Sequence, residues 1–134
     1  MTTARRLAPL LAVAACVLAG CGEAERDTAT ATEAADVTVR VTGAGTQPVV
    51  ASLECGADAP CDGRRLDSLR AVLDRNGNAS RACTQVYGGP ERAHVTGTLR
   101  GRVVEAEVTR ADGCGIADYD ALFAALGRTP PIAP

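Results

Sequence analysis

Apolar and polar residues alternate over residues 36–42, and three valines fall on one face of this segment. A period of two residues is typical of a β-strand with one buried face. Residues 43–48, which contain two glycines and a proline, are predicted to form a turn. A second strand is predicted at residues 49–55.

Residues 63–74 carry apolar side chains at spacings of three and four, which is the period of an amphipathic helix. The residues on this face are Leu66, Leu69, Val72 and Leu73. Asp62 precedes the segment and suits the N-cap, where a carboxylate accepts hydrogen bonds from free backbone N–H groups. Asn76 and Gly77 are predicted to form a left-handed exit from the helix. We assign this helix to packing and not to chemistry.

Two further strands are predicted at residues 93–99 and 102–109, and only Arg100 and Gly101 separate them. A two-residue connection predicts a β-hairpin, with Gly101 at a position that needs positive φ. On the second strand, apolar residues are expected to face the core and acidic residues to face water: Val104, Ala106 and Val108 against Glu105 and Glu107.

Residues 118–126 show a second amphipathic helical pattern, and Gly127 follows where the helix is expected to end. The proline-rich segment 129–134 cannot continue this helix. The predicted elements form one α+β domain over residues 36–128, with an antiparallel sheet of about five strands and two short helices. With only three aromatic residues in the chain, its core is built from Val, Leu and Ala. A thin core of this kind favours disulfides as additional support.

Four cysteines lie in this domain, and four cysteines allow three pairings. They are Cys55, Cys61, Cys83 and Cys114. Cys55 and Cys61 are close enough in sequence to suit a local bridge. A metal site at this pair is the alternative, but the chain has one histidine and no third soft ligand nearby.

An extended run, residues 84–87, lies between the first predicted helix and the hairpin. Cys83 precedes it, and a Gly-Gly-Pro turn at residues 88–90 closes it. An extended segment that is fixed at both ends has the form in which a protease recognises a peptide. Fixed ends also make the cleaved peptide slow to leave.

The first 20 residues have the organisation of an export signal. Arg5 and Arg6 form its basic region, and residues 7–18 form an apolar segment too short to span a bilayer. The signal ends in Leu18-Ala19-Gly20-Cys21, which resembles the lipobox of bacterial lipoproteins. In such proteins the cysteine thiol receives a diacylglyceryl group and the cysteine becomes the first residue. We therefore expect lipidation of Cys21, with an ordinary secretory peptide cleaved nearby as the alternative.

Residues 21–35 contain no large apolar side chain and are predicted to form a flexible tether. Removal of residues 1–20 takes away two of the 14 basic residues and no acidic residue, which leaves 12 against 16 and a net charge of −4. An acidic chain without a basic patch argues against nucleic acid and against electrostatic binding to anionic lipid. The mature protein is expected at the extracellular face of the cell membrane, held there by its lipid alone.

Catalysis is not expected from this sequence. His94 is the one histidine and lies near the start of a predicted strand, which favours a surface position over the role of general base. The sequence contains no Gly-x-Ser-x-Gly motif, phosphate-binding loop or zinc signature, and it implies no cofactor. The four domain cysteines are better explained as bridges than as nucleophilic thiolates in an oxidising compartment.

Three segments carry a resemblance to a known family: residues 83–90 (CTQVYGGP), 95–103 (VTGTLRGRV) and 112–114 (DGC). Over about residues 37–126 the chain resembles the subtilisin inhibitor-like family, the family of the Streptomyces subtilisin inhibitor. The resemblance implies a disulfide between Cys83 and Cys114 beside the local bridge, within a sandwich of sheet and helices.

In that family the scissile bond follows the second residue after the loop cysteine. The resemblance therefore places the reactive bond between Gln85 (P1) and Val86 (P1′), with Cys83 as P3 and with Thr84 and Tyr87 as flanking residues. The implied function is inhibition of a serine protease by a substrate-like loop that is cut slowly and resealed. Gln85 has no charge for a trypsin-like pocket and no ring for a chymotrypsin-like one. Subtilisin-like proteases, whose S1 pocket is broad, are therefore the favoured targets, and trypsin-like proteases are the second choice.

Three features depart from the family pattern: a glutamine at P1 where Met or Lys is common, a short first disulfide loop, and the lipid anchor. The alternative function is a surface lipoprotein that keeps the fold and binds another partner without inhibiting a protease. For assembly, the resemblance leaves a monomer and a homodimer formed through the sheet face both open.

Overall fold

The computed structural model describes residues 33–76, 78 and 80–134. Within these residues four strands form one antiparallel sheet in the order β2-β1-β3-β4. The strands are β1 (Ala35–Thr42), β2 (Val49–Cys55), β3 (Arg92–Leu99) and β4 (Arg102–Thr109). The helices are α2 (Gly63–Arg75) and α3 (Gly113–Leu126). The fold is therefore α+β and antiparallel, as the sequence predicts.

Several sequence predictions fall on the N-terminal part of the chain. The export signal at residues 1–20, the lipidated Cys21, most of the tether and, further on, Gly77 lie outside the described residues. Ala35, which the sequence assigned to the tether, is the first residue of β1 and is buried. Asn76 has an extended conformation and not a left-handed one. In the part of the chain that the structure describes, no helix is long and apolar enough to cross a membrane.

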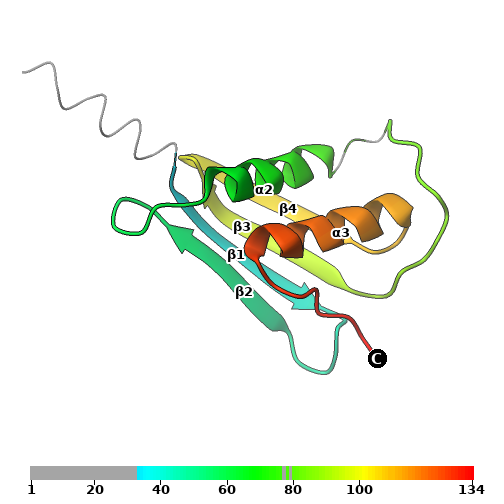
Figure 1. Ribbon diagram of the computed structural model, residues 1–134. Helices are drawn as coiled ribbons and strands as arrows, with labels where there is room; N and C mark the ends of the chain where they lie inside the picture. Colours follow the sequence, from blue (N-terminus) through cyan, green and yellow to red (C-terminus); the bar gives the residue numbers. More distant parts are fainter. Residues whose placement is uncertain (1–32, 77, 79) are drawn as a thin grey trace, which may run out of the picture.

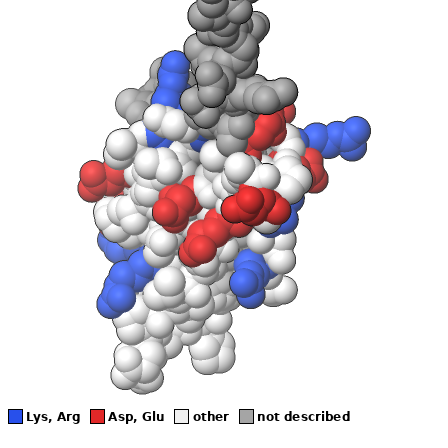
Figure 2. All heavy atoms as spheres, turned by 90° about the vertical axis from the view of Figure 1, so that its left-hand side faces the viewer, with Lys and Arg blue, Asp and Glu red and all other residues white. Residues whose placement is uncertain are grey.

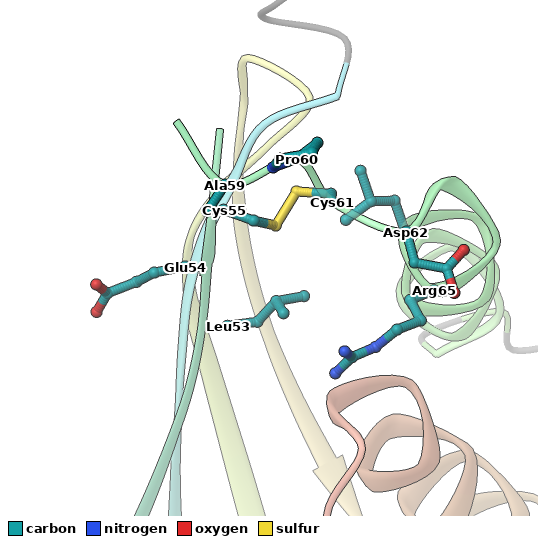
Figure 3. A pocket seen from close by; sticks show the side chains of 9 residues that line it. Leu53, Glu54, Cys55, Ala59, Pro60, Cys61, Asp62 and Arg65 are labelled. Atoms are coloured by element: carbon teal, nitrogen blue, oxygen red, sulfur yellow. A yellow bond between two sulfur atoms is a disulfide. The ribbon is translucent and has the colours of Figure 1, made fainter. Parts of the chain in front are cut away.

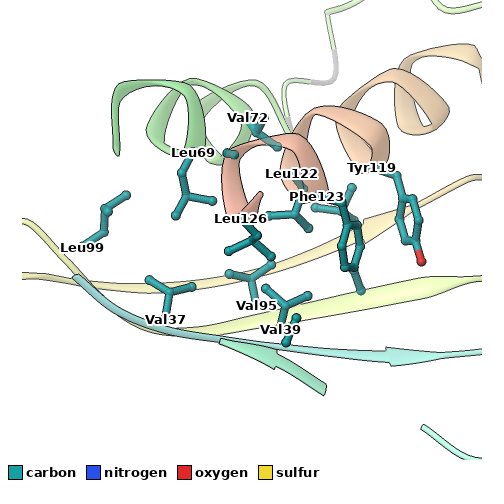
Figure 4. Close-up of a cluster of buried hydrophobic side chains, with 14 of the residues drawn as sticks. Val37, Val39, Leu69, Val72, Val95, Leu99, Tyr119, Leu122, Phe123 and Leu126 are labelled. Atoms are coloured by element: carbon teal, nitrogen blue, oxygen red, sulfur yellow. The ribbon is translucent and has the colours of Figure 1, made fainter. Parts of the chain in front are cut away.

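The two helices lie side by side and antiparallel on one face of the sheet (Figure 1). The alternating pattern of β1 explains this arrangement, because Val37, Val39 and Val41 are at most 1% exposed and all point toward the helices. Figure 4 shows side chains of α2 and α3 packed onto those of the sheet. The labelled members of this core are Val37, Val39, Leu69, Val72, Val95, Leu99, Tyr119, Leu122, Phe123 and Leu126.

The expectation of about five strands exceeds the four that the described residues form. Residues 84–87, predicted as an extended run, join no sheet. The carbonyl of Thr84 accepts a hydrogen bond from the Gly113 N–H at 2.9 Å, and the Gly88 N–H donates to the Arg110 carbonyl at 2.8 Å. A strand needs a repeating series of such bonds along its edge. With only one such bond on each side of residues 85–87, the run stays a loop.

Helix α3 begins at Gly113, earlier than the predicted start at residue 118. Its first turn contains two glycines, Gly113 and Gly115, which lower helix propensity and hide the start from a search for apolar periodicity. Asp112 offsets this weakness as the N-cap, because its Oδ1 accepts a hydrogen bond from the Gly115 N–H at 2.7 Å. Gly127 ends the helix with a φ of 66°, as predicted.

The β3–β4 hairpin confirms its sequence prediction. Arg100 and Gly101 form the turn with φ values of 51° and 73°, the positive dihedrals that match a two-residue connection to the twist of the strands. His94 is exposed on β3, the surface strand position that was expected. The inward and outward residues of β4 are also as predicted: Val104, Ala106 and Val108 lie on the more buried face, and Glu105 and Glu107 are exposed.

Candidate functional site

Residues 83–90, hereafter the exposed loop, contain all the predicted reactive residues and lie in the connection from α2 to β3. Figure 1 shows this connection passing around the end of the molecule where α3 begins. The side chains from Thr84 to Tyr87 are exposed, and Val86 and Tyr87 keep 57% and 67% of their surface open. Apolar side chains with this exposure are available for contact with another protein.

Three fixed points hold the exposed loop. The Cys83–Cys114 disulfide joins it to the first turn of α3, with the two Cα atoms 5.3 Å apart. The Thr84 carbonyl and the Gly88 N–H make the two backbone hydrogen bonds described above. Among the described residues, no backbone hydrogen bond reaches Gln85, Val86 or Tyr87. The chain is thus held before and after a span of three exposed residues.

Two glycines allow the exposed loop to lie this close to α3. A Cβ atom on Gly113 would lie 2.0 Å from Oγ1 of Thr84, and one on Gly88 would lie 2.5 Å from Cγ1 of Ile116. Neither distance is compatible with a side chain at the glycine unless the facing side chain or the loop moves. The glycines of the Gly-Gly-Pro turn and of the Asp-Gly-Cys segment therefore set the path of the loop as well as its flexibility.

Buried charged side chains gather at both ends of the exposed loop. In the described part of the chain the buried charged residues are Glu91, Arg110 and Asp118. Asp118 belongs to α3, and its carboxylate pairs with Arg81, two residues before Cys83, and with Nε of Arg75 at 3.3 Å. A carboxylate out of water needs such partners, because an unpaired buried charge is costly. The Arg81 pair therefore fixes the start of the loop against α3.

Glu91 follows the exposed loop directly and is 1% exposed. Its Oε2 accepts a hydrogen bond from Nη1 of Arg110 at 3.2 Å, and its Oε1 accepts one from the N–H of Ala133 at 2.6 Å. Burial alone would raise the pKa of the Glu91 carboxyl. The N–H groups of Ala133 and of Glu91 itself, together with Arg110, outweigh burial and hold this pKa below its ordinary value. Glu91 is therefore ionised at neutral pH.

The burial of these three charged residues was not predicted from the sequence, although the sequence pattern contains a signal for it. Glu91 and Arg110 each continue the buried phase of their strand, and the β3–β4 register, extended by one pair beyond Arg92 and Thr109, places them opposite each other. Asp118 lies one helical turn before Leu122 on the buried side of α3. A charged residue at a position where the pattern calls for an apolar one predicts a buried partner.

The Cys55–Cys61 disulfide lies at the other end of the molecule, between the end of β2 and the start of α2. It confirms the predicted local bridge. A cavity of about 220 Å³ opens beside it (Figure 3). Two polar residues that line this cavity already have partners, because Asp62 caps α2 through the Arg64 N–H and Arg65 donates to the carbonyl of Ala125 at 2.9 Å.

The side chains of Cys83, Asp112 and Cys114 lie within 4.8 Å of one another, a spacing at which such groups can hold a metal ion. The two sulfur atoms are joined to each other, however, and a disulfide sulfur is not a thiolate ligand. The sulfurs of Cys55 and Cys61 are likewise joined, so this pair forms the local bridge rather than the alternative metal site.

The end of the molecule opposite the exposed loop carries charges of both signs (Figure 2). Acidic side chains lie together across the middle of the face that Figure 2 shows, and basic side chains lie toward its borders. An acidic centre is unfavourable for contact with anionic surfaces.

Comparisons with known proteins give no match, whether with protein-family models, with curated proteins or with solved structures. The functional interpretation therefore depends on the residues of the exposed loop and on the way in which the fold holds them.

Proposed function

We propose that this protein is a serine protease inhibitor that acts through the exposed loop, with subtilisin-like proteases as its targets. The observation that carries this proposal is a span of three exposed residues, 85–87, held on both sides by the disulfide and by two backbone hydrogen bonds. A loop fixed before binding loses less conformational entropy when it enters a protease cleft. The resemblance of residues 83–90 to the subtilisin inhibitor-like family supports the same function.

In this proposal the protease attacks the bond between Gln85 and Val86. Gln85 enters the closed S1 pocket, and its neighbours lie along the cleft. After cleavage the Gln85 side stays attached to α3 through Cys83 and Thr84. The Val86 side stays part of the chain that continues into β3, and its Gly88 N–H stays bonded to the Arg110 carbonyl. Both new ends remain near the catalytic serine, so resealing of the bond competes with release.

Substitutions of Gln85 test this function. We expect the mature protein to inhibit subtilisin, and we expect Gln85→Asp to raise the inhibition constant by about 1,000-fold, because an unpaired charge would enter the S1 pocket. Gln85→Lys should create inhibition of trypsin, whose pocket contains an acid that pairs with the new charge. Thermal unfolding should be unchanged in both variants, since Gln85 is exposed.

The test is the inhibition constants of the parent, Gln85→Asp and Gln85→Lys against subtilisin and trypsin. If Gln85→Asp inhibits as strongly as the parent, the assignment of the reactive bond is wrong. A folded parent protein that leaves subtilisin fully active would favour the alternative, a surface lipoprotein that binds without inhibiting.

We also propose that a diacylglyceryl group on Cys21 retains the protein at the extracellular face of the membrane, since two acyl chains are sufficient for stable retention. The described chain enters β1 at the end of the molecule opposite the exposed loop (Figure 1), so an anchor on this side leaves the loop free. Cys21→Ser should transfer the protein from the membrane fraction to the soluble fraction. Mass spectrometry that finds an unmodified Cys21 in the mature parent would contradict the anchor.

A further inference from the structure

The C-terminal segment, residues 129–134, is fixed to the body of the protein by two hydrogen bonds. The Ala133 N–H donates to the buried carboxylate of Glu91 at 2.6 Å, and the hydroxyl of Tyr119 donates to the carbonyl of Pro131 at 2.8 Å. Burial, helped by the charge of Glu91, raises the pKa of Tyr119 to about 12. The phenol therefore stays protonated and remains a donor over the whole physiological pH range.

The same buried residues also hold the end of the exposed loop. The backbone carbonyl of Arg110 accepts the Gly88 N–H at 2.8 Å, while the Arg110 side chain donates to Glu91 at 3.2 Å. Gly89 lies directly on the Glu91 carboxylate, since a Cβ atom on Gly89 would be 2.1 Å from Oε2. The guanidinium of Arg110 lies over the ring of Tyr119, with Cζ 5.7 Å from the ring centre. One polar cluster thus contacts the C-terminal segment on one side and the loop on the other.

The two sides of the reactive bond are held by different means. The Gln85 side has a covalent bond to α3 through Cys83. On the Val86 side the nearest covalent attachment is β3, which begins six residues later at Arg92, so the position of Val86 depends on the Gly88 hydrogen bond and on the contact of Gly89 with Glu91. Noncovalent contacts open and close far more often than a disulfide is broken. When contacts around the loop weaken, the Val86 side is therefore expected to leave its position before the Gln85 side does.

We propose that Glu91 is a positioning residue and that residues 131–133 act with it as a brace for the Val86 side of the exposed loop. This inference rests on the proposed function. After cleavage, the new amino group of Val86 can attack the ester that joins Gln85 to the protease serine. The peptide bond then forms, the ester bond breaks, and the serine oxygen takes up the proton that the amine gives up. The brace favours this return reaction over hydrolysis, because it keeps the amine close to the ester.

Two variants remove all or part of the brace without touching the reactive residues. Deletion of residues 131–134 removes both the Pro131 acceptor and the Ala133 donor, and Tyr119→Phe removes only the hydroxyl that holds Pro131. Val72→Ala is the matched control, because Val72 is a buried core residue of α2 that belongs to no part of the cluster. The three variants and the parent should be compared as mature proteins with both disulfides formed.

The first measurement is the equilibrium ratio of protein cut at Gln85–Val86 to intact protein with catalytic amounts of subtilisin, together with the rate of cutting. Deletion of residues 131–134 should raise both by at least about tenfold, and Tyr119→Phe should raise them by about threefold. The initial inhibition constant should change by less than about threefold. Val72→Ala should lower the thermal stability and leave the ratio of cut to intact protein at the parent value. Equal ratios in the deletion variant and the parent, or an equal rise in Val72→Ala, would overturn the proposal.

The second measurement does not depend on inhibition. Hydrogen exchange of the Gly88 amide should become at least about tenfold faster in the deletion variant, while amides in the centre of β1 keep their exchange rates. If the parent protein does not inhibit subtilisin but Gly88 exchange responds as described, the proposed function fails and the brace stands. If Gly88 exchange is unchanged by the deletion, the brace is wrong whether or not the protein inhibits.

Discussion

The two disulfides of this protein span nearly equal distances and have very different surroundings. Their Cα atoms are 5.2 Å apart in Cys55–Cys61 and 5.3 Å apart in Cys83–Cys114. The first joins residues 6 positions apart and closes the connection from β2 to α2. The second joins residues 31 positions apart and attaches the start of the exposed loop to α3, beside the buried Asp118 and its partner Arg81.

This difference shows how the molecule holds regular and irregular backbone. Strands and helices satisfy their own backbone groups, so apolar burial on one face is enough to fix them. The exposed loop has no repeating series of backbone hydrogen bonds, and apolar contact is not directional enough to hold it in one conformation. Directional bonds therefore concentrate at its two ends, where Asp118 and Glu91 accept them.

The largest difference is expected when each disulfide is removed by changing both of its cysteines to alanine. Loss of Cys83–Cys114 should weaken inhibition of subtilisin by about 100-fold or more, because the Gln85 side is no longer preorganised. Loss of Cys55–Cys61 should change it by less than about threefold. The chain-entropy estimate gives stability losses of about 3–4 kcal/mol for the long loop and about 2 kcal/mol for the short one.

Inhibition constants and urea unfolding of the two double variants test this prediction. Equal losses of inhibition from the two removals would contradict the assignment of a special role to the Cys83–Cys114 bridge.

The acids of the two regions should also differ in what they contribute. Asp118→Ala should cost about 2 kcal/mol, because a buried carboxylate with two arginine partners is lost, while the arginine groups can still reach water. Asp67→Ala removes the exposed partner of Arg100 near the other end and should cost less than about 1 kcal/mol. Urea unfolding of both variants measures the difference. A larger loss for Asp67→Ala would show that burial of the acid is not what matters.

The parts of the structure that sequence predicted well are those set by local pattern. The alternating valines of β1, the apolar face of α2 and the Arg100-Gly101 turn each depend on neighbours within a few residues, and all were predicted. The start of α3 was missed because the Asp112 cap outweighs two glycines in the first turn. The buried charges were missed because their partners are distant in sequence, as with Glu91 and Ala133. Such pairings follow from strand register and from the path of the C-terminal segment, and no short motif marks them.

The smallest expected effect is the pH dependence that Glu91 contributes. Its pKa is lowered in the folded protein. Its stabilising contribution is therefore complete above the ordinary carboxyl pKa of about 4.3 and is lost as the pH falls through the lowered value. Glu91→Gln has no such titration, so the stability difference between parent and variant should shrink as the pH is lowered from 7 to 2. A difference that stays constant over this range would contradict the lowered pKa.

The claim that the fold holds Gln85–Val86 as a reactive bond is tested most directly by prolonged incubation of the mature protein with catalytic amounts of subtilisin, followed by N-terminal sequencing and intact mass before and after reduction. We expect one slow cut, a new N-terminus that begins with Val86 and Tyr87, and two fragments that stay joined through Cys83–Cys114 until reduction, with inhibition preserved throughout. A cut at another bond, or rapid degradation without inhibition, would contradict this claim.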